Sequence, residues 1–195
     1  MKKWVKTVGS AVMVLLLASG CVMIAYARWT QPIADADAAM AAGDVGRALA
    51  SYAVAEQRFD GLPLLKRLLS SDYDRVMGNQ LRLLFHVERN EDTIEKAARA
   101  PEGANPHFWA GAACFEQGRA EADPSARLAW FGRAQQELMK AVDAAPDDWD
   151  AKFDLELALR LTFELRRNPQ TPPGELMKLL RPDPMPGAVP TKPAG

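Results

Sequence analysis

The sequence predicts an all-α protein that begins with one membrane-spanning helix. Two observations carry this prediction. Apolar residues recur at helical spacing in several segments after residue 30, whereas no alternating strand pattern of useful length occurs. Before residue 28 lies a charge-free apolar run that matches the thickness of a bilayer. The chain therefore divides into a basic start (1–6), an anchor (7–27), a helical domain (30–166) and a proline-rich tail (167–195).

Residues 7–27 form the predicted anchor. As a helix they span roughly 31 Å, which fits the hydrocarbon core of a membrane. Lys2, Lys3 and Lys6 precede the run, and only Arg28 follows it closely. Because positive charge stays on the cytoplasmic side, we expect a single-pass protein of a bacterial inner membrane. Its N-terminus would be cytoplasmic and its main domain periplasmic.

A second interpretation of the same segment involves Cys21. The residues LLLASGC resemble a bacterial lipobox, in which the cysteine becomes lipidated after cleavage. The apolar run continues past Cys21 as VMIAYA, whereas a mature lipoprotein usually starts with a polar tether. The continuation favours an uncleaved anchor, and a lipoprotein adaptor in envelope biogenesis, lipidated at Cys21, stays as the alternative.

The distribution of charge excludes one class of partner. After the anchor the chain carries 20 Lys or Arg against 25 Asp or Glu, a net charge of −5. Binding of nucleic acid needs a basic face, so nucleic acid is not an expected partner. Cys21 and Cys114, the two cysteines, cannot build a disulfide framework.

Helix boundaries in the domain are marked by capping residues and prolines. The domain is expected to start at Gln31–Pro32, and Asn90–Asp92 is expected to interrupt a helix. Asn105–Pro106, Asp123–Pro124 and Asp148 are typical helix starts, and Ser71–Asp72 is a further predicted cap. Gly118 and Pro146 are expected to follow helix ends.

The last helix, after Asp148, carries two apolar rows. Phe153, Leu157, Leu161 and Leu165 are expected on one face, and a second row adds another face, so this helix should be covered on two sides. The second row consists of Leu155, Leu159 and Phe163. Glu156 stands where a small residue would let a further helix approach. We therefore expect this helix to end the stack. In the tail that follows, prolines forbid a long helix, and only GELMKLL could form two turns; the rest is either disordered or a short docking peptide.

Two segments share the spacing of a helical repeat. Ala48, Tyr52 and Ala55 match Ala134, Leu138 and Ala141, and Pro146 follows the second set. Here the chain resembles the tetratricopeptide (TPR) helix-turn-helix repeat, which places small residues where paired helices touch. Gly111 matches the small residue of the first helix and Gly118 the turn. About eleven extra residues before the second helix depart from the ~34-residue period, and residues 62–100 have no clear match.

A closer resemblance covers roughly residues 105–182. The segments DDWDAKFDLELALR, FWAGAACFEQGRAE and TPPGELMKLLRP resemble small TPR-like membrane proteins that accompany MoxR-type ATPases and von Willebrand factor A (VWA) proteins. One branch of that family, the MxaK-like proteins, belongs to the maturation set of methanol dehydrogenase. The resemblance implies an accessory role in assembling an envelope complex, with a VWA protein and a MoxR-type ATPase as partners.

No catalytic, cofactor or metal site is predicted. His86 and His107 lack zinc-ligand spacing, and Cys114 lies among Ala and Phe, as a core thiol would. The acids around Asp148 are explained by helix capping, and no phosphate loop or nucleophile motif occurs. We therefore expect an interaction protein and no enzyme. Trp149 is expected to pack between helices, and Trp130, beside Phe131, is the predicted partner contact.

Overall fold

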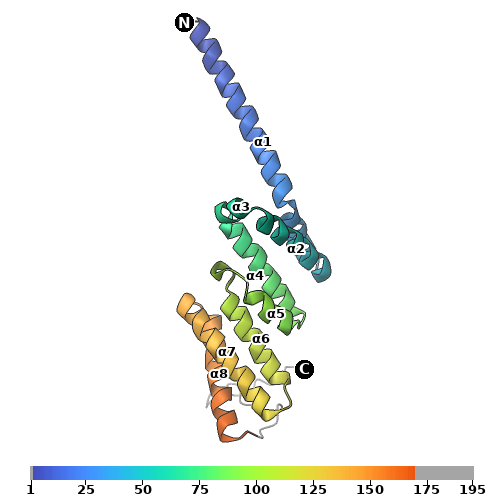
Figure 1. Cartoon of the computed structure of the whole chain (residues 1–195), viewed down its shortest axis with the longest axis vertical. Coiled ribbons are helices and arrows are strands. Elements are labelled where there is room, and N and C mark those ends of the chain that lie inside the picture. The colour runs from blue at the N-terminus through green and yellow to red at the C-terminus, as the bar shows by residue number, and fades with distance from the viewer. Residues whose placement is uncertain (1, 170–195) are drawn as a thin grey trace, which may run out of the picture. The chain divides into compact units, whose positions relative to one another are not determined.

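The computed structural model describes residues 2–169, with side chains from residue 13 onward, and confirms the all-α prediction. Within these residues it contains eight α-helices, a short 3-10 turn and no strand (Figure 1). The helices are α1 (Lys2–Ala41), α2 (Val45–Gly61), α3 (Pro63–Leu68), α4 (Ser70–His86), α5 (Asn90–Ala97), α6 (Pro106–Ala120), α7 (Pro124–Ala144) and α8 (Trp149–Arg167). GELMKLL and the rest of the tail from residue 170 lie outside the described residues.

The described chain forms two compact units. Unit 1 contains residues 2–83 and 100–104, and unit 2 contains residues 84–99 and 105–169. Unit 1 is built from α1, α2, α3 and most of α4. Unit 2 is built from α5, α6, α7 and α8 together with the last turn of α4. The helical domain expected over residues 30–166 therefore has two separate cores.

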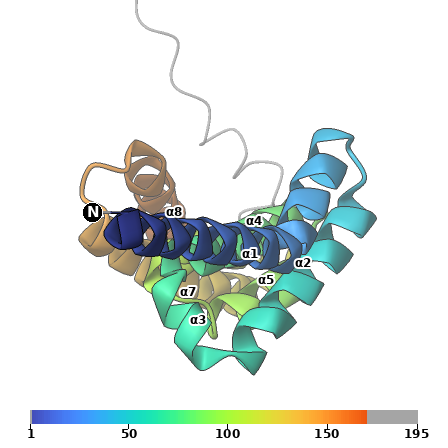
Figure 2. The ribbon, with the colours of Figure 1, turned by 90° about the horizontal axis from the view of Figure 1, so that it is seen from above.

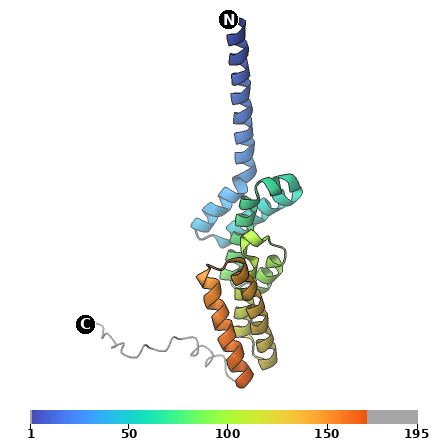
Figure 3. The ribbon, with the colours of Figure 1, turned by 90° about the vertical axis from the view of Figure 1, so that its left-hand side faces the viewer.

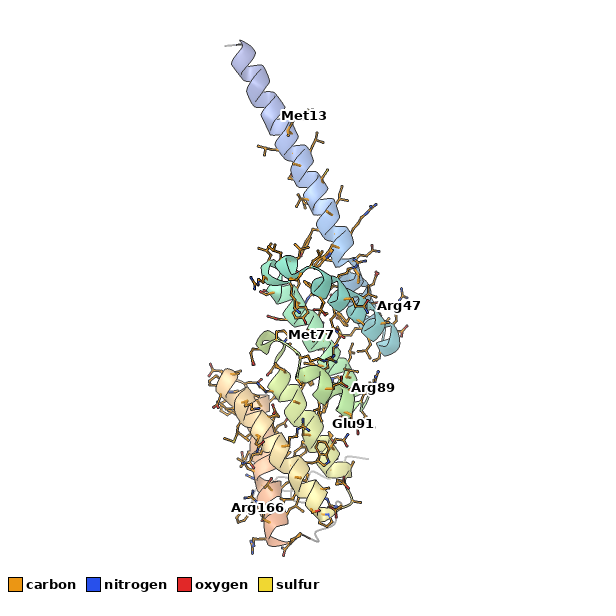
Figure 4. All side chains as sticks on the ribbon, viewed as in Figure 1. Met13, Arg47, Met77, Arg89, Glu91 and Arg166 are labelled. Carbon is orange, nitrogen blue, oxygen red and sulfur yellow. The ribbon has the colours of Figure 1, made fainter. Side chains whose placement is uncertain are left out.

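The first helix is one continuous element of 40 residues. Its N-terminal part is long and apolar enough to cross a membrane. Side chains in this part, such as Met13, project outward from the helix and are exposed (Figure 4). The helix does not end at Gln31–Pro32, where the sequence predicted the domain to start. Pro32 lies inside α1, and Ile33, Ala36 and Ala39 after it are buried in unit 1. The anchor and the first helix of the domain are the same helix.

A hydrogen bond from α2 explains how α1 passes Pro32. Proline has no N–H, so the carbonyl of Arg28, four residues earlier, loses its donor within the helix. The Nη1 atom of Arg58 donates to this carbonyl at 3.0 Å and to the carbonyl of Trp29 at 2.7 Å. The unsatisfied acceptor is thus paired by a charged side chain, which lowers the cost of the proline.

Unit 1 is held together by α2, which runs back beside the C-terminal part of α1 (Figure 2). The ring of Phe59 meets Trp29 edge-on at 4.6 Å, and that of Tyr73 on α4 at 5.3 Å. Tyr52 is fully buried; its hydroxyl donates to Asp37 of α1 and accepts from the Asn79 amide of α4 at 2.7 Å. Burial and the bond to Asp37 raise the pKa of Tyr52 to about 12. The buried hydroxyl therefore stays neutral and links three helices.

Unit 2 is centred on the hairpin of α6 and α7. Gly111 of α6 faces Leu138, and a Cβ at Gly111 would lie 2.6 Å from its Cγ and 3.2 Å from its backbone nitrogen. Gly118 faces the ring of Phe131, 3.1 Å from where its Cβ would be. Gly118 is inside α6, so the prediction that it follows the helix end was wrong. It is used for close helix contact, since α6 continues to Ala120.

Three helix starts were predicted at Asn105–Pro106, Asp123–Pro124 and Asp148, and two of them have the expected side-chain cap. The side chain of Asp123 accepts from the Ala126 amide, and that of Asp148 accepts from the amides of Asp150 and Ala151. Asn105 has the predicted position before α6, but its φ of 54° and the absence of a side-chain cap differ from an ordinary Asn cap.

Two other boundary predictions were wrong. Asn90–Asp92 does not interrupt a helix but forms the first turn of α5, where its acids favour the helix dipole. Ser71–Asp72 does not cap α4, which already begins at Ser70.

The close contact at Gly111 can be tested with a matched glycine. We expect Gly111→Ala to destabilise the protein by about 1–3 kcal/mol, because the added carbon overlaps Leu138. Gly132 of α7 has nothing within 4 Å of its Cβ position. We therefore expect Gly132→Ala to stabilise by up to about 1 kcal/mol through helix propensity. Thermal unfolding of the full chain in detergent, followed by circular dichroism, measures both. Equal effects of the two variants would contradict the proposed packing.

Candidate protein-interaction surface on the last helix

The last helix is fixed at its start and along its inner face. Asp148 caps it, with bonds of 3.0 and 3.1 Å from the amides of Asp150 and Ala151. α8 lies beside α7 in Figure 3, in agreement with their contacts. Its buried residues are Ala151, Ala158, Leu161, Thr162 and Leu165. The Thr162 hydroxyl donates to the Ala158 carbonyl at 2.7 Å, so this buried hydroxyl is paired.

The core that receives this inner face comes from both helices of the hairpin. It contains Cys114 and Phe115 of α6 together with Phe131, Ala134 and Leu138 of α7. Phe115 and Phe131 meet edge-on with ring centroids 5.2 Å apart, a favourable aromatic geometry. The inner face of α8 is therefore anchored on a well-packed core, which fixes the orientation of its other side.

The outer face of α8 is apolar and open to solvent. Trp149 is 77% exposed, Phe153 63% and Phe163 61%. We call these three residues the α8 aromatic face. They lie in one stripe with Glu156 and Arg160, because successive spacings of four and three residues return to the same side of a helix. Large aromatic side chains in such a row are costly in water and are common at binding surfaces.

Charged groups border the α8 aromatic face. The Nζ atom of Lys152 lies 4.7 Å from the centre of the Trp149 ring, a cation–π arrangement. Glu156 and Arg160 form an ion pair one turn apart in the middle of the stripe. This ion pair is exposed on both sides, so it contributes little to stability. The surface thus combines exposed aromatic side chains with a charged pair between them and a lysine beside Trp149.

The structure contradicts the prediction that α8 is covered on two sides. Of the first predicted row, Leu161 and Leu165 are buried and Leu157 is half-buried, but Phe153 is exposed. A strict four-residue spacing drifts by about 40° per step around an α-helix. Phe153 and Leu165 are three steps apart and therefore face different directions. In the second row, Leu155 is half-buried, whereas Leu159 and Phe163 are exposed.

The structure contradicts the role predicted for Trp149 and does not test the one predicted for Trp130. Trp149 does not pack between helices, and that prediction was wrong. Trp130 of α7 is half-buried against the core, with the Arg133 guanidinium 5.8 Å from its ring, while Phe131 beside it is fully buried. Adjacent helical residues point to different sides, which explains this difference. The partner contact at Trp130 stays a prediction.

The row of exposed aromatic residues on α8 was the stronger indication of a binding surface. It could have been found in the sequence from the alternating spacing of four and three residues.

An unfavourable charge lies on the inner side of α8, which faces α6. Burial and the nearby carboxylates of Asp150, Glu116 and Asp148 raise the pKa of Asp154 to about 6. Asp150 and Asp148 belong to the start of α8, and Glu116 belongs to α6. No three acids, histidines or cysteines within the described residues are arranged to hold a metal ion. These surroundings thus disfavour the ionised form of Asp154 in the folded protein.

The remaining predicted residues take part in the core or lie on α1. Cys114 is buried, and burial raises its thiol pKa to about 11, which suits a core thiol and not a nucleophile. Cys21 is exposed on α1. His107 contacts Glu137 at 2.7 Å between α6 and α7. Burial alone would raise the pKa of Glu137, but His107 and Lys140 lower it below its usual range.

One recess in unit 1 is lined largely by polar and charged side chains. It has a volume of about 140 Å³ and lies between α1 and α4. Its charged residues are Asp37, Asp72 and Arg75, and Arg75 lies 3.2 Å from Asp37 and 3.9 Å from Asp72. Arg75 thus pairs with both carboxylates of the recess.

Comparisons of the chain with protein-family models, with curated proteins and with solved structures find no match.

The charge at Asp154 predicts a pH-dependent stability. Its folded pKa of about 6 lies above the ordinary value of 3.8. The ionised form is disfavoured in the fold, so the penalty is absent below pH 3.8, grows up to about pH 6 and is complete above it. We expect Asp154→Asn to stabilise the protein at pH 7 by about 1–2 kcal/mol.

Urea unfolding of the full chain in detergent at pH 4 and pH 7 measures this difference. Asp147→Asn, in the exposed turn before α8, is the control. A gain from Asp154→Asn that is equal at both pH values would contradict the electrostatic explanation.

Proposed function

We propose that this protein is a membrane-anchored scaffold that binds a partner protein through the α8 aromatic face. The observation that carries the proposal is the exposure of Trp149, Phe153 and Phe163 on a helix whose opposite side is firmly packed. Tryptophan and other aromatic residues dominate the binding energy of many protein interfaces. A rigid helix that presents them in one row suits an apolar helical face on the partner.

The packing of α6 and α7 supports a TPR-like interpretation of this scaffold. Ala134 and Ala141 are fully buried on either side of Leu138, and Gly111 lets Leu138 approach α6 closely. Small residues at the helix contact and a large one between them are the packing logic of that repeat. We propose that α8 is the first helix of a further, incomplete repeat, whose exposed side is completed by the partner.

The partners that the sequence resemblance implies are a VWA protein and a MoxR-type ATPase. In this proposal the scaffold helps them to assemble or mature an envelope complex, with methanol dehydrogenase maturation as one form of that role. The apolar part of α1 supports attachment to the bacterial inner membrane as a single-pass protein. The lysines at its start favour a cytoplasmic N-terminus and a periplasmic domain. Anchoring raises the effective concentration of the scaffold near membrane-bound partners.

Affinity purification of the full chain from detergent-solubilised membranes tests this proposal. We expect a VWA protein or a MoxR-type ATPase to co-purify, and we expect Trp149→Ala with Phe153→Ala to lower its recovery at least about tenfold, as loss of central aromatic anchors does. Met139→Ala on α7, also an exposed apolar residue, is the matched control and should have no effect. Trp130→Ala tests the contact predicted from sequence.

Two results would contradict the proposal. One is the absence of any VWA protein or ATPase among the recovered proteins. The other is unchanged recovery of the partner by the double variant while circular dichroism shows that the variant is folded.

The mode of membrane attachment gives a separate prediction. We expect Cys21→Ala to leave membrane association unchanged, because an uncleaved α1 needs no lipid chain. Metabolic labelling with a fatty-acid analogue should give no signal in either form. A label on the natural chain that disappears in Cys21→Ala would instead support the alternative, a lipoprotein adaptor lipidated at Cys21.

A further inference from the structure

The short helix α3 exposes a ridge of leucines. Leu64 is 76% exposed, Leu68 72% and Leu62, which precedes the helix, 48%. We call these residues the α3 leucine ridge. Leu64 and Leu68 are four residues apart and therefore lie on the same side of the helix. None of the six residues of α3 is buried, so the ridge is not part of the core of unit 1.

Contacts within unit 1 fix where this ridge lies along α1. The Tyr26 hydroxyl donates to Asp72 at 3.2 Å, shortly after α3 ends. Before α3 begins, Arg58 bonds to the carbonyls of Arg28 and Trp29. Both flanks of α3 are thus held at residues 26–29 of α1, where the charge-free run ends. In Figure 3, α3 lies within unit 1 near the level at which the apolar part of α1 emerges from that unit.

This level is the expected water–lipid boundary. Tyrosine, tryptophan, arginine and lysine are typical of that boundary, and Tyr26, Arg28 and Trp29 occur there on α1. Farther from it, Arg75 of α4 reaches Asp37 and Arg82 of α4 reaches Met40, so α4 runs from this level along the later part of α1. Within unit 1, α3 therefore lies between two segments, the end of α2 and the start of α4, that contact α1 where the charge-free run ends.

The charges around the ridge complement an anionic lipid surface. Arg58, Lys66 and Arg67 are the basic residues between positions 58 and 67, and the one acid among them, Asp60, is paired with Lys66 at 2.8 Å. Arg58 and Arg67 are exposed. A helix with apolar side chains on one side and Lys or Arg beside them is typical of a membrane-interface segment.

We propose that the α3 leucine ridge is a second membrane contact, which inserts between the lipid headgroups beside α1. Leu64 and Leu68 would enter the boundary between headgroups and acyl chains, and Arg67 would bind lipid phosphate. The proposal rests on α1 crossing the membrane but not on the α8 aromatic face or its partner. Its consequence is a fixed tilt of unit 1 against the membrane, because a helix and a separate ridge are both attached to the same surface.

The test uses the full chain in nanodiscs of phosphatidylethanolamine and phosphatidylglycerol. An environment-sensitive NBD probe is attached at Leu64→Cys or Leu68→Cys in a Cys21→Ala background, where the buried Cys114 stays unlabelled. We expect lipids with a nitroxide near the headgroup to quench either probe about twofold or more, as for a shallowly inserted side chain. Val54→Cys, an exposed apolar site on α2 of the same unit, is the matched control and should not be quenched.

Two additions, a probe at Cys21 and the variant Arg67→Glu, distinguish failure of the α3 proposal from failure of α1 to insert. A probe on the natural Cys21 reports insertion of α1; if it is quenched while those at 64 and 68 behave like that at 54, the α3 proposal is overturned and α1 is not. If the probe at Cys21 is not quenched either, both the α3 proposal and the insertion of α1 are overturned. A blue-shifted but unquenched probe at 64 would mean that protein covers the ridge, which also overturns the proposal. Arg67→Glu should reduce quenching at 64 in anionic nanodiscs; an unchanged signal would overturn the role of phosphate binding.

Discussion

The hydrogen bonds from Arg58 to the carbonyls of Arg28 and Trp29 are the interaction on which the account of unit 1 depends. They pair the acceptor that Pro32 leaves open, so α1 continues from the apolar segment into the folded domain. Because the helix continues, Ile33, Ala36 and Ala39 lie on the same rod as the anchor and are buried in unit 1. The position of α3 beside the end of the apolar run follows from the same contacts.

Sequence patterns predicted the elements well where the determinants are local. The caps at Asp123 and Asp148 and the end of α7 before Pro146 depend on neighbouring residues alone. The break expected at Pro32 failed because its compensation comes from Arg58, which is 26 residues later. Gly118 was assigned to a turn because glycine is common there, whereas its actual role is set by the ring of Phe131 on another helix.

The α8 aromatic face was predictable only in part. One reason is the geometry of the helix, and the other is that burial depends on which elements pack against it. Grouping Phe153 with Leu161 and Leu165 overlooked the drift of a four-residue spacing around the helix. Burial on the second side would have required another element against α8, and the described residues provide none. Trp149 and Phe163 therefore stay exposed and available for a partner. Unit 1 thus exposes leucines and basic residues on α3 in addition to the apolar run of α1, and unit 2 exposes aromatic residues with an ion pair on α8.

A distance measurement across Pro32 shows whether α1 is continuous from the apolar run into unit 1. Spin labels at Cys21 and at Ala41→Cys, in the full chain in nanodiscs, flank the junction, while Cys114 is buried. A continuous helix predicts a narrow distance distribution centred at about 30 Å, which should broaden in Arg58→Ala. A broad distribution at clearly shorter distances in the natural chain would show that the anchor and the domain are separate helices, and would contradict the account.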